Sequence, residues 1–288
     1  MDLTNLRLEI AICMKAASAA EIEDLEPMKA GMTNDSYVFK YKNKRYIYRI
    51  PGKGSSELVN RQREYEAYKA IRWLNISDVI IYYDKKTGIK ISEFIENAHT
   101  CNPYNMRETT ACLLFVKNNL HKLNKFINSR IDLPDMILKY QSLMGKSKYA
   151  DHEDITTKVL QKVRYYRKGR HDYCLCHFDL NPDNFLLTKS GHIHLLDWEY
   201  AGMHDPWYDV AGWIVYKKYD KDMVDNIFEA YLERGATAAE FKKFYACIAA
   251  MGLLWSNWCE YKRKCGEEFG DYAEQQFNYA KKYIELAE

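Results

Sequence analysis

The fold is decided by two short stretches of this chain, Cys-His-Phe-Asp-Leu-Asn-Pro-Asp-Asn at residues 176–184 and Leu-Leu-Asp-Trp-Glu-Tyr at residues 195–200. They contain Asp179, Asn184 and Asp197 at the spacing that phosphoryl transfer requires. That reaction needs a carboxylate near the attacking hydroxyl, oxygen ligands for magnesium, and positive charge on the phosphates. Asp179 can supply the carboxylate. Because Mg²⁺ prefers oxygen ligands, Asn184 and Asp197 can hold the metal.

The residues between the two stretches explain why these side chains should meet. Residues 185–187 form a short apolar strand, residues 189–191 a Lys-Ser-Gly turn, and residues 192–196 a second strand, which together predict a hairpin. Since a hairpin returns its last residue to the level of its first, Asn184 and Asp197 should arrive at the same open end. Asp and Asn are also common in ordinary turns. The full series of His-x-Asp-x-x-x-x-Asn, hairpin and Asp favours the functional interpretation.

Composition narrows the class of protein and of partner. The chain has 288 residues, 47% of them hydrophobic and 28% charged, which is typical of a globular protein large enough for two lobes. Its 42 basic and 40 acidic residues give a net charge of +2, too little to attract nucleic acid or an anionic membrane surface. We therefore expect a small-molecule partner and no nucleic acid, and the sequence leaves the oligomeric state open.

The apolar stretches and the cysteines indicate an intracellular protein. The charge-free run at residues 244–259 is shorter than the ~20 residues of a membrane span and is better interpreted as a buried helix. The N-terminal residues contain no credible signal-peptide core. Eight cysteines are scattered without a repeated metal-ligand spacing. We expect a cytoplasmic protein with no membrane insertion, whose cysteines are reduced core thiols without a metal or disulfide role.

The chain divides into a β-rich part and a helical part. Residues 25–95 are β-rich with one helix at 58–74, on which Glu64, Tyr68 and Ile71 share one face. The expected strands pair as hairpins and are residues 37–41, 45–50, 79–83 and 89–94. From residue 105 the pattern is helical, with core helices predicted from the apolar spacing over residues 113–127 and 241–258.

At these residues the chain resembles the choline/ethanolamine kinase family, within the group of aminoglycoside-phosphotransferase-like, protein-kinase-like enzymes, and bacterial choline kinases above all. Residues 176–187 match the family's catalytic loop and residues 196–202 its metal-binding segment. Asp-Pro-Trp-Tyr-Asp at 205–209 resembles the segment that leads into a helix. The stretches at 255–258 and 269–273 resemble the helices that build the choline pocket.

The resemblance implies an α+β, bilobal, protein-kinase-like fold. Residues 1–95 would form a small N-terminal antiparallel β lobe with one helix, which binds ATP. Residues 96–288 would form a larger, mainly helical lobe for catalysis and substrate binding. The implied cofactors are ATP and Mg²⁺, with Asp179 as catalytic base and Asn184 and Asp197 as metal ligands.

The resemblance also assigns the nucleotide-binding residues. Arg49 stands where the family keeps a phosphate-binding basic residue, and Glu64 where a helix carboxylate pairs with it. The loop at residues 30–36, which includes Asn34 and Ser36, would cover the phosphates. Residues 92–95 correspond to the hinge that holds adenine by backbone groups, and the hinge residues assigned to nucleotide binding are Glu93, Phe94 and Ile95.

The acceptor site implied by the resemblance is aromatic. A quaternary ammonium is best held by ring faces and nearby carboxylate charge, although tryptophans in an apolar stripe are by default core residues. The residues assigned to substrate binding are Asn181, Glu199, Tyr200, Trp255, Trp258 and Tyr272.

The function expected from these observations is ATP-dependent phosphorylation of choline to phosphocholine. If the protein is an enzyme, the alternative substrates are other small acceptors such as ethanolamine, thiamine or an aminoglycoside. An aminoglycoside would require a broad acidic surface rather than aromatic faces. From a different class, the chain could be a catalytically silent nucleotide-binding protein. The presence of Asp179, Asn184 and Asp197 argues against that reading.

Overall fold

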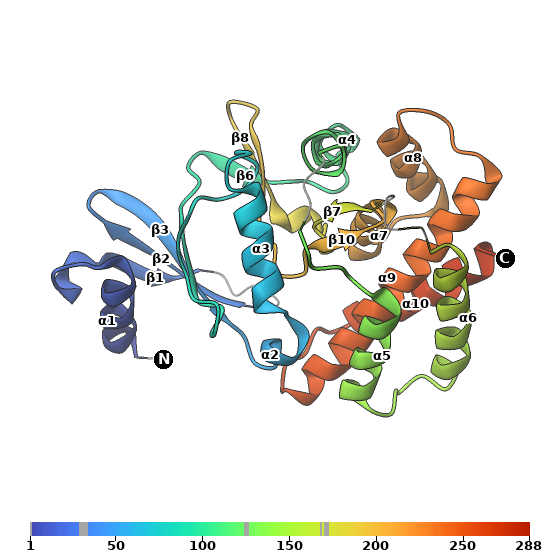
Figure 1. The fold of residues 1–288 in the computed structure, drawn as a ribbon, viewed down its shortest axis with the longest axis horizontal. Coiled ribbons are helices and arrows are strands. Elements are labelled where there is room, and N and C mark those ends of the chain that lie inside the picture. Colours follow the sequence, from blue (N-terminus) through green and yellow to red (C-terminus); the bar gives the residue numbers. More distant parts are fainter. Residues whose placement is uncertain (1, 29–33, 124–126, 168, 170–172) are drawn as a thin grey trace. The chain divides into compact units, whose positions relative to one another are not determined.

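The computed structural model describes residues 2–28, 34–123, 127–167, 169 and 173–288. Its contacts divide the chain into two compact units (Figure 1). The N-terminal unit contains Met1–His99 and Leu186–Glu199, and the C-terminal unit contains Thr100–Phe185 and Tyr200–Glu288. Residues 186–199 thus pack with the N-terminal unit although they lie far along the chain.

The N-terminal unit is built on a five-stranded antiparallel sheet of strand order β1-β2-β3-β5-β4. Strands β8 and β9 form the predicted hairpin and belong to a three-stranded sheet of order β6-β8-β9. The elements are α1 Leu3–Met14, η1 Ala19–Glu21, β1 Glu23–Pro27, β2 Asn34–Tyr41, β3 Lys44–Pro51, α2 Ser55–Leu58, α3 Arg61–Ile71, β4 Ile80–Tyr83, β5 Lys90–Glu93, β6 Ala98–Thr100, β8 Phe185–Thr188 and β9 Ile193–Leu195.

The local sequence explains the β2–β3 hairpin and α3. Lys42 and Asn43 join the strands with φ of 48° and 62°. Two positive φ values are the mark of a type I′ turn, whose twist matches that of the strands. Asn60 begins α3 by accepting a hydrogen bond from the Arg63 main-chain N–H at 3.0 Å. Glu64, with Tyr68 and Ile71, lies on the buried face of α3, as predicted.

Helix α1 and strand β1 were not predicted from the sequence, which indicated one helix in this part of the chain. In α1, Leu6 and Ile10 are buried while Leu8 and Ile12 are exposed, so its apolar residues do not form a single stripe. In β1 only Leu25 of the five residues is buried. Both elements are stabilised by packing into a core that includes Phe39 and other residues distant in sequence.

The C-terminal unit is mainly helical, with the two-stranded antiparallel sheet β7-β10. Its elements are α4 Met106–Val116, η2 Lys117–His121, α5 Leu133–Met144, α6 His152–Tyr165, β7 Cys174–Cys176, η4 Pro182–Asn184, β10 Gly202–His204, α7 Trp207–Tyr216, α8 Lys221–Leu232, α9 Ala238–Lys264 and α10 Tyr272–Leu286. The element η2 is a π-helical turn, whereas the sequence predicted one regular helix over residues 113–127.

Helix α9 is the central element of the C-terminal unit, as its apolar stripe predicted. It begins with a capping box, in which Thr237 and Glu240 satisfy each other's main-chain N–H groups. All residues from Lys243 to Glu260 are buried. Helix α10 crosses it so closely that a Cβ added to Gly252 would stand 2.6 Å from the main-chain oxygen of Gln276. The crossing therefore requires glycine at position 252.

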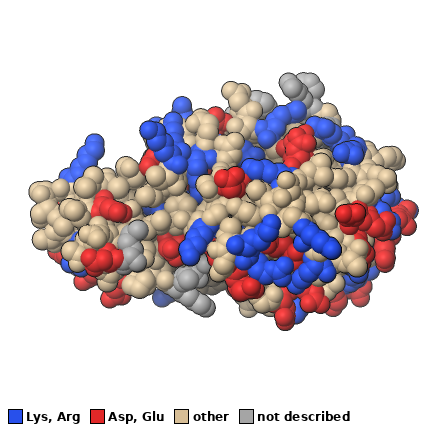
Figure 2. Space-filling view, turned by 90° about the horizontal axis from the view of Figure 1, so that it is seen from below, with Lys and Arg blue, Asp and Glu red and all other residues tan. Residues whose placement is uncertain are grey.

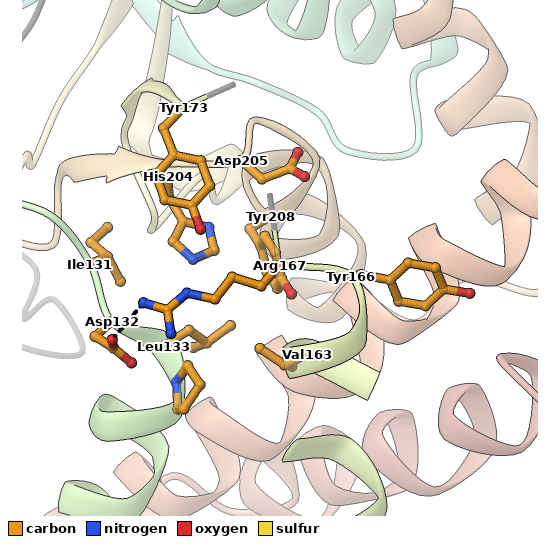
Figure 3. A pocket seen from close by; sticks show the side chains of 11 residues that line it. Ile131, Asp132, Leu133, Val163, Tyr166, Arg167, Tyr173, His204, Asp205 and Tyr208 are labelled. Carbon is orange, nitrogen blue, oxygen red and sulfur yellow. Dashed lines mark hydrogen bonds and ion pairs between the residues drawn. The ribbon is translucent and has the colours of Figure 1, made fainter. Parts of the chain in front are cut away.

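A small cavity lies between β10 and the α5 and α6 ends (Figure 3). It encloses about 20 Å³, room for roughly one water molecule. Arg167 closes one side by an ion pair of 3.2 Å with Asp132. His204 forms another wall, is 5% exposed, and its Nδ1 has no hydrogen-bond partner among the described residues. Burial lowers the pKa of His204 from 6.5 to about 4, although the nearby Asp205 carboxylate acts in the opposite direction.

The surface carries both signs of charge. Figure 2 shows basic and acidic side chains on the face in view. Within the described part of the chain, no helix combines the length and the apolar character needed to span a membrane.

Replacing Gly252 by alanine should destabilise the protein. The added Cβ would meet main-chain atoms of α10, and overpacking of this kind costs about 1–3 kcal/mol, more than the ~1 kcal/mol gained from helix propensity. The matched control is Gly212→Ala in α7, where a Cβ would make ordinary contacts at 3.6 Å. Urea unfolding should show a lower midpoint for Gly252→Ala only. Equal midpoints in the two variants would contradict the close crossing.

His204 should make stability depend on pH. Because its pKa is lowered in the folded state to about 4, the unfolded chain binds a proton first as the pH falls below 6.5. The free energy of unfolding should then decrease by up to ~1.4 kcal/mol per pH unit down to about pH 4. His204→Phe keeps a ring in place and should flatten this slope. The exposed His99, replaced by Phe, is the control. Parallel slopes in wild type and His204→Phe would disprove the assignment.

Candidate active site

The catalytic loop is anchored by a buried carboxylate. Asp209, near the start of α7, accepts hydrogen bonds from the main-chain N–H groups of His177 at 2.9 Å and Phe178 at 2.7 Å. Phe178 has a φ of 66°, a conformation that is strained for a bulky residue. Such strain persists only where surrounding contacts impose it. The Asp209 carboxylate therefore fixes the backbone immediately before Asp179.

Asp179 and Asn184 are brought together inside this loop. The Asn184 side-chain nitrogen donates to the Asp179 main-chain oxygen at 3.0 Å and to its carboxylate at 3.3 Å. Because both bonds use the amide nitrogen, the amide oxygen is the Asn184 atom that can bind a cation. Asn181 caps the turn η4 by accepting from the Asp183 N–H at 2.6 Å. Its position is explained by this cap, and its side chain is buried.

Two tyrosines lie close enough to the catalytic loop for the Asp179 charge to act on both phenols. Tyr216 ends α7 and Tyr272 begins α10, and their ring centroids are 5.7 Å apart in an edge-on arrangement. Burial raises the pKa of both phenols, and the charge of Asp179 raises them further. Tyr272 was predicted from the sequence, but Tyr216 was missed. Its place at the end of an apolar helix carries no motif that could have identified it.

The remaining predicted aromatic residues form a buried group in the same unit. Tyr200 meets Trp255 edge-on at 5.1 Å, and the Trp258 indole N–H donates to the Tyr200 hydroxyl at 2.9 Å. Trp255 and Trp258 are 7% and 3% exposed. The structure thus brings these three side chains together, and it gives Trp258 a polar anchor as well as a packing role.

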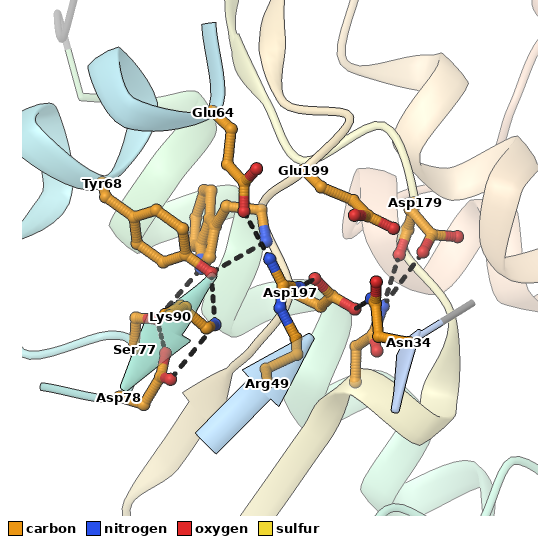
Figure 4. A network of polar contacts seen from close by, with 12 residues as sticks. Asn34, Arg49, Glu64, Tyr68, Ser77, Asp78, Lys90, Asp179, Asp197 and Glu199 are labelled. Carbon is orange, nitrogen blue, oxygen red and sulfur yellow. Dashed lines mark hydrogen bonds and ion pairs between the residues drawn. The ribbon is translucent and has the colours of Figure 1, made fainter. Parts of the chain in front are cut away.

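In the N-terminal unit, Asp197 and Arg49 form the centre of an ion cluster (Figure 4). The Arg49 guanidinium donates to the Asp197 carboxylate and, at 2.5 Å, to Glu64. Burial opposes the charge, but Asp197 and Glu64 together raise the pKa of Arg49 well above its usual value. Asp197 itself has a φ of 64°, which Asp tolerates better than most residues. The predicted pairing of Arg49 with Glu64 is present.

Arg61 extends the cluster and was not identified from the sequence. Its Nη1 donates to Glu64 at 2.7 Å and to Glu199 at 3.3 Å. Burial, followed by the charge of Asp197, raises the pKa of Glu199 to about 8. Glu199 was assigned to substrate binding, and the structure places it, 1% exposed, against Arg61.

A second polar network supports the backbone next to Asp197. Lys90 donates to the Tyr68 hydroxyl at 2.7 Å and to Asp78 at 3.4 Å. The same hydroxyl accepts from the Trp198 main-chain N–H at 3.5 Å, and the Trp198 indole donates to Ser77 at 3.1 Å (Figure 4). The residue that follows Asp197 is therefore held on both its main chain and its side chain.

The predicted phosphate-covering loop is only partly described. Residues 30–33 lie outside the described residues. Asn34 is buried, and its amide nitrogen donates to Asp197 at 3.4 Å. Ser36 lies in β2 opposite Arg49, where its main-chain oxygen accepts from the Met28 N–H at 2.8 Å.

The predicted hinge lies at the end of β5. The Glu93 N–H donates to the Val79 oxygen at 2.9 Å and the Phe94 N–H to the Arg45 oxygen at 3.0 Å. Since both N–H groups are used inside the sheet, an adenine at this hinge would have to use main-chain carbonyl groups or Ile95. The Arg45 guanidinium lies 3.9 Å from the centre of the Phe94 ring.

The donor atoms offered by this chain suit a hard cation. Asp197 provides carboxylate oxygens and Asn184 an amide oxygen, which are the ligands that Mg²⁺ takes from proteins. These two residues contribute neither sulfur nor imidazole, the donors that softer metals prefer.

Comparison with known proteins shows which family has a similar sequence and fold. The model of the choline/ethanolamine kinase family matches residues 25–230. Protein LicA of Haemophilus influenzae is 30% identical over 271 residues, which cover 88% of this chain and 78% of that protein.

Solved structures agree. Choline kinase LicA from Streptococcus pneumoniae superposes with a TM-score of 0.82 at 28% identity, covering 96% of this chain and 98% of that one. A structure of LicA in complex with AMP gives a TM-score of 0.82 at 25% identity over the full length of both chains. The fold is thus protein-kinase-like, with an antiparallel sheet in one unit and helices dominating the other, as predicted.

Proposed function

Because this chain belongs to the choline/ethanolamine kinase family, we propose that it transfers the γ-phosphoryl group of ATP to the hydroxyl of choline. The family makes it a phosphotransferase that acts on the alcohol group of a small substrate. The relative solved with AMP supports a nucleotide as the phosphoryl donor. The products would be phosphocholine and ADP.

Aromatic side chains around the base are the observation that supports choline in particular. The charge of Asp179 acts on Tyr216 and Tyr272, whose rings meet edge-on, and Tyr200 and Trp255 form a further aromatic pair in the same unit. A quaternary ammonium has no N–H to donate, so ring faces and nearby carboxylate charge are the groups that bind it well. Ethanolamine, which has three N–H donors, would favour hydrogen-bond acceptors instead.

Asp179 is the proposed catalytic base. As its carboxylate takes the hydroxyl proton, the choline oxygen forms a bond to the γ-phosphorus, and the bond from phosphorus to the β,γ-bridging oxygen breaks to release ADP. The Asn184 amide holds the carboxylate in place. Asp209 holds the preceding backbone, so the base is positioned before substrate arrives.

The N-terminal lobe, proposed as residues 1–95, would supply the phosphate-binding charge. Arg49 is oriented by Glu64, and Arg61 holds the other oxygen of Glu64. Mg²⁺, when bound, would neutralise charge on the β- and γ-phosphates. The residues that would hold it are Asp197 and Asn184. The aromatic acceptor residues and the base belong to the C-terminal lobe, proposed as residues 96–288.

Removing the base should abolish turnover while nucleotide binding continues. We expect Asp179→Ala to lower kcat by ~10²-fold or more, with the affinity for ATP nearly unchanged. Asp183→Asn is the control, because Asp183 is an exposed carboxylate of the same loop. Coupled ADP release and nucleotide titration measure the two effects. A kcat above about a tenth of wild type in Asp179→Ala would remove Asp179 as base.

The aromatic site predicts which acceptor is preferred. Activity measured by ADP release should decrease in the order choline, dimethylethanolamine, monomethylethanolamine, ethanolamine, because each lost methyl group weakens contact with the rings. Tyr272→Ala should raise the choline KM by about 2- to 30-fold, corresponding to a cation–π contact of ~0.5–2 kcal/mol, and should spare the KM for ATP. Tyr272→Phe keeps the ring and should behave as wild type.

Two results would contradict the choline assignment. If ethanolamine or an aminoglycoside were turned over faster than choline, the enzyme would be a small-alcohol kinase for another acceptor. A lower melting temperature in Tyr272→Ala, with unchanged choline KM, would mean that this ring is only a packing residue.

A further inference from the structure

A cluster of sulfur and imidazole side chains in the C-terminal unit takes no part in the proposed reaction. It consists of His121, Cys174 and Cys176, whose ligand atoms all lie within 4.8 Å of one another. The two cysteines alternate along β7, so their side chains lie on the same face of the strand. Both are free thiols, Cys174 half-buried and Cys176 buried.

We propose that His121, Cys174 and Cys176 bind a thiophilic divalent metal ion of the Zn²⁺ class. Two sulfurs bound at about 2.3 Å to one tetrahedral Zn²⁺ are about 3.8 Å apart. The Cys174 and Cys176 sulfurs are 3.8 Å apart in this structure. A disulfide would need them at about 2.05 Å. Strand β7 therefore already spaces the two sulfurs for an ion.

His121 is oriented as metal-binding histidines are. Its Nε2 lies 2.8 Å from the Asp209 carboxylate, which also accepts the two main-chain N–H bonds of the catalytic loop. A carboxylate can only accept, so Nε2 carries the proton and the lone pair of the neutral ring is on Nδ1. A carboxylate that orients the ring in this way is the usual partner of a metal-bound histidine.

Tyr231 marks where the ion would bind. Its hydroxyl lies 2.9 Å from His121 Nδ1. The hydroxyl is therefore in contact with one of the three proposed ligands. An ion bound to Nδ1 would take over the lone pair that now accepts from Tyr231.

A single helical turn positions two of the residues in this region. The π-helical turn η2 carries both His121 and Lys117. The Lys117 ammonium binds the Tyr231 main-chain oxygen at 2.8 Å, so the turn positions Tyr231 as well. Single π-helical turns within helices are frequent at functional sites.

The charges balance when the ion binds. Each thiol loses its proton to solvent and becomes a thiolate, so two protons leave, and the two thiolate charges match the 2+ charge of the ion. Opposite charges that cancel limit the cost of burial. A separation of at most 4.8 Å must contract only to the ~3.5 Å that a tetrahedral ion imposes between nitrogen and sulfur ligands.

Cobalt substitution tests this site without relying on enzyme activity. Full-length protein, reduced with a non-thiol reductant and freed of metal, is titrated with Co²⁺. We expect one Co²⁺ per chain, with the intense thiolate-to-cobalt absorption of a tetrahedral sulfur site, and stoichiometric displacement by Zn²⁺. Zn²⁺ should also raise the melting temperature, because an ion that binds the folded state stabilises it.

Variants distinguish this site from other cysteines. Cys174→Ser and Cys176→Ser should each weaken Co²⁺ binding by at least tenfold and remove most of the absorption. The matched controls are Cys265→Ser, half-buried, and Cys259→Ser, buried, which should behave as wild type. Tyr231→Phe should retain or strengthen binding, because it removes the group that competes for His121 Nδ1.

The opposite results overturn the proposal. If the thiols are only hydrogen-bonded to each other in the core, wild-type protein will show no thiolate-to-cobalt absorption at one equivalent. Absorption that survives in Cys174→Ser, or that is lost equally in Cys265→Ser, would place the metal elsewhere. Cys174 is half-buried, so its variant remains informative even if Cys176→Ser fails to fold. Both outcomes are independent of whether choline is the substrate.

Discussion

The buried carboxylate of Asp209 is the group on which the catalytic loop depends. It is fully buried, and burying a charge is costly unless hydrogen bonds satisfy it. Here the main-chain N–H groups of His177 and Phe178 and the His121 ring supply those bonds. The carboxylate needs these donors to offset its burial, and the strained backbone at Phe178 needs the carboxylate to hold its conformation. Asp179 follows Phe178 directly in the chain, so its backbone position is fixed as well.

The N-terminal unit uses the same principle with full ion pairs. Arg49 and Arg61 share three carboxylates, those of Glu64, Asp197 and Glu199. Burial, followed by the charge of Asp197, raises the pKa of Glu199 to about 8. Removing one partner of a buried pair typically costs ~3–5 kcal/mol, because the other charge is left uncompensated. The cluster therefore fixes Asp197 in one place, even though buried ion pairs add little net stability.

Aromatic residues serve both packing and recognition in the C-terminal unit. Trp258 and Tyr200 are buried and joined by a hydrogen bond, which is typical of core residues. Tyr216 and Tyr272 are less buried, and the charge of Asp179 acts on both phenols. The physical distinction is between rings that are fully buried and rings that remain partly exposed near a functional charge. That distinction, rather than the number of aromatic residues, supports a cationic acceptor.

The sequence alone predicted the elements whose signals are local. The β8–β9 hairpin, the buried face of α3 and the long helix α9 all follow from periodicity and turn residues within one segment. The pairing of Arg49 with Glu64 was also expected, from the family resemblance, and is present. The protein-kinase-like fold and the family were predicted from the resemblance of residues 176–187 and 196–202 to known motifs.

Other features were decided only by tertiary structure. Helix α1 has apolar residues on two faces, and only its contact with the sheet determines which are buried. Tyr216 meets Tyr272, and Arg61 meets Glu199, across long separations in sequence. His121 is likewise distant in sequence from Cys174 and Cys176, and no spacing of residues along the chain predicts that cluster. Sequence patterns record what neighbouring residues do together, whereas a site assembled from distant segments exists only once packing has brought them into contact.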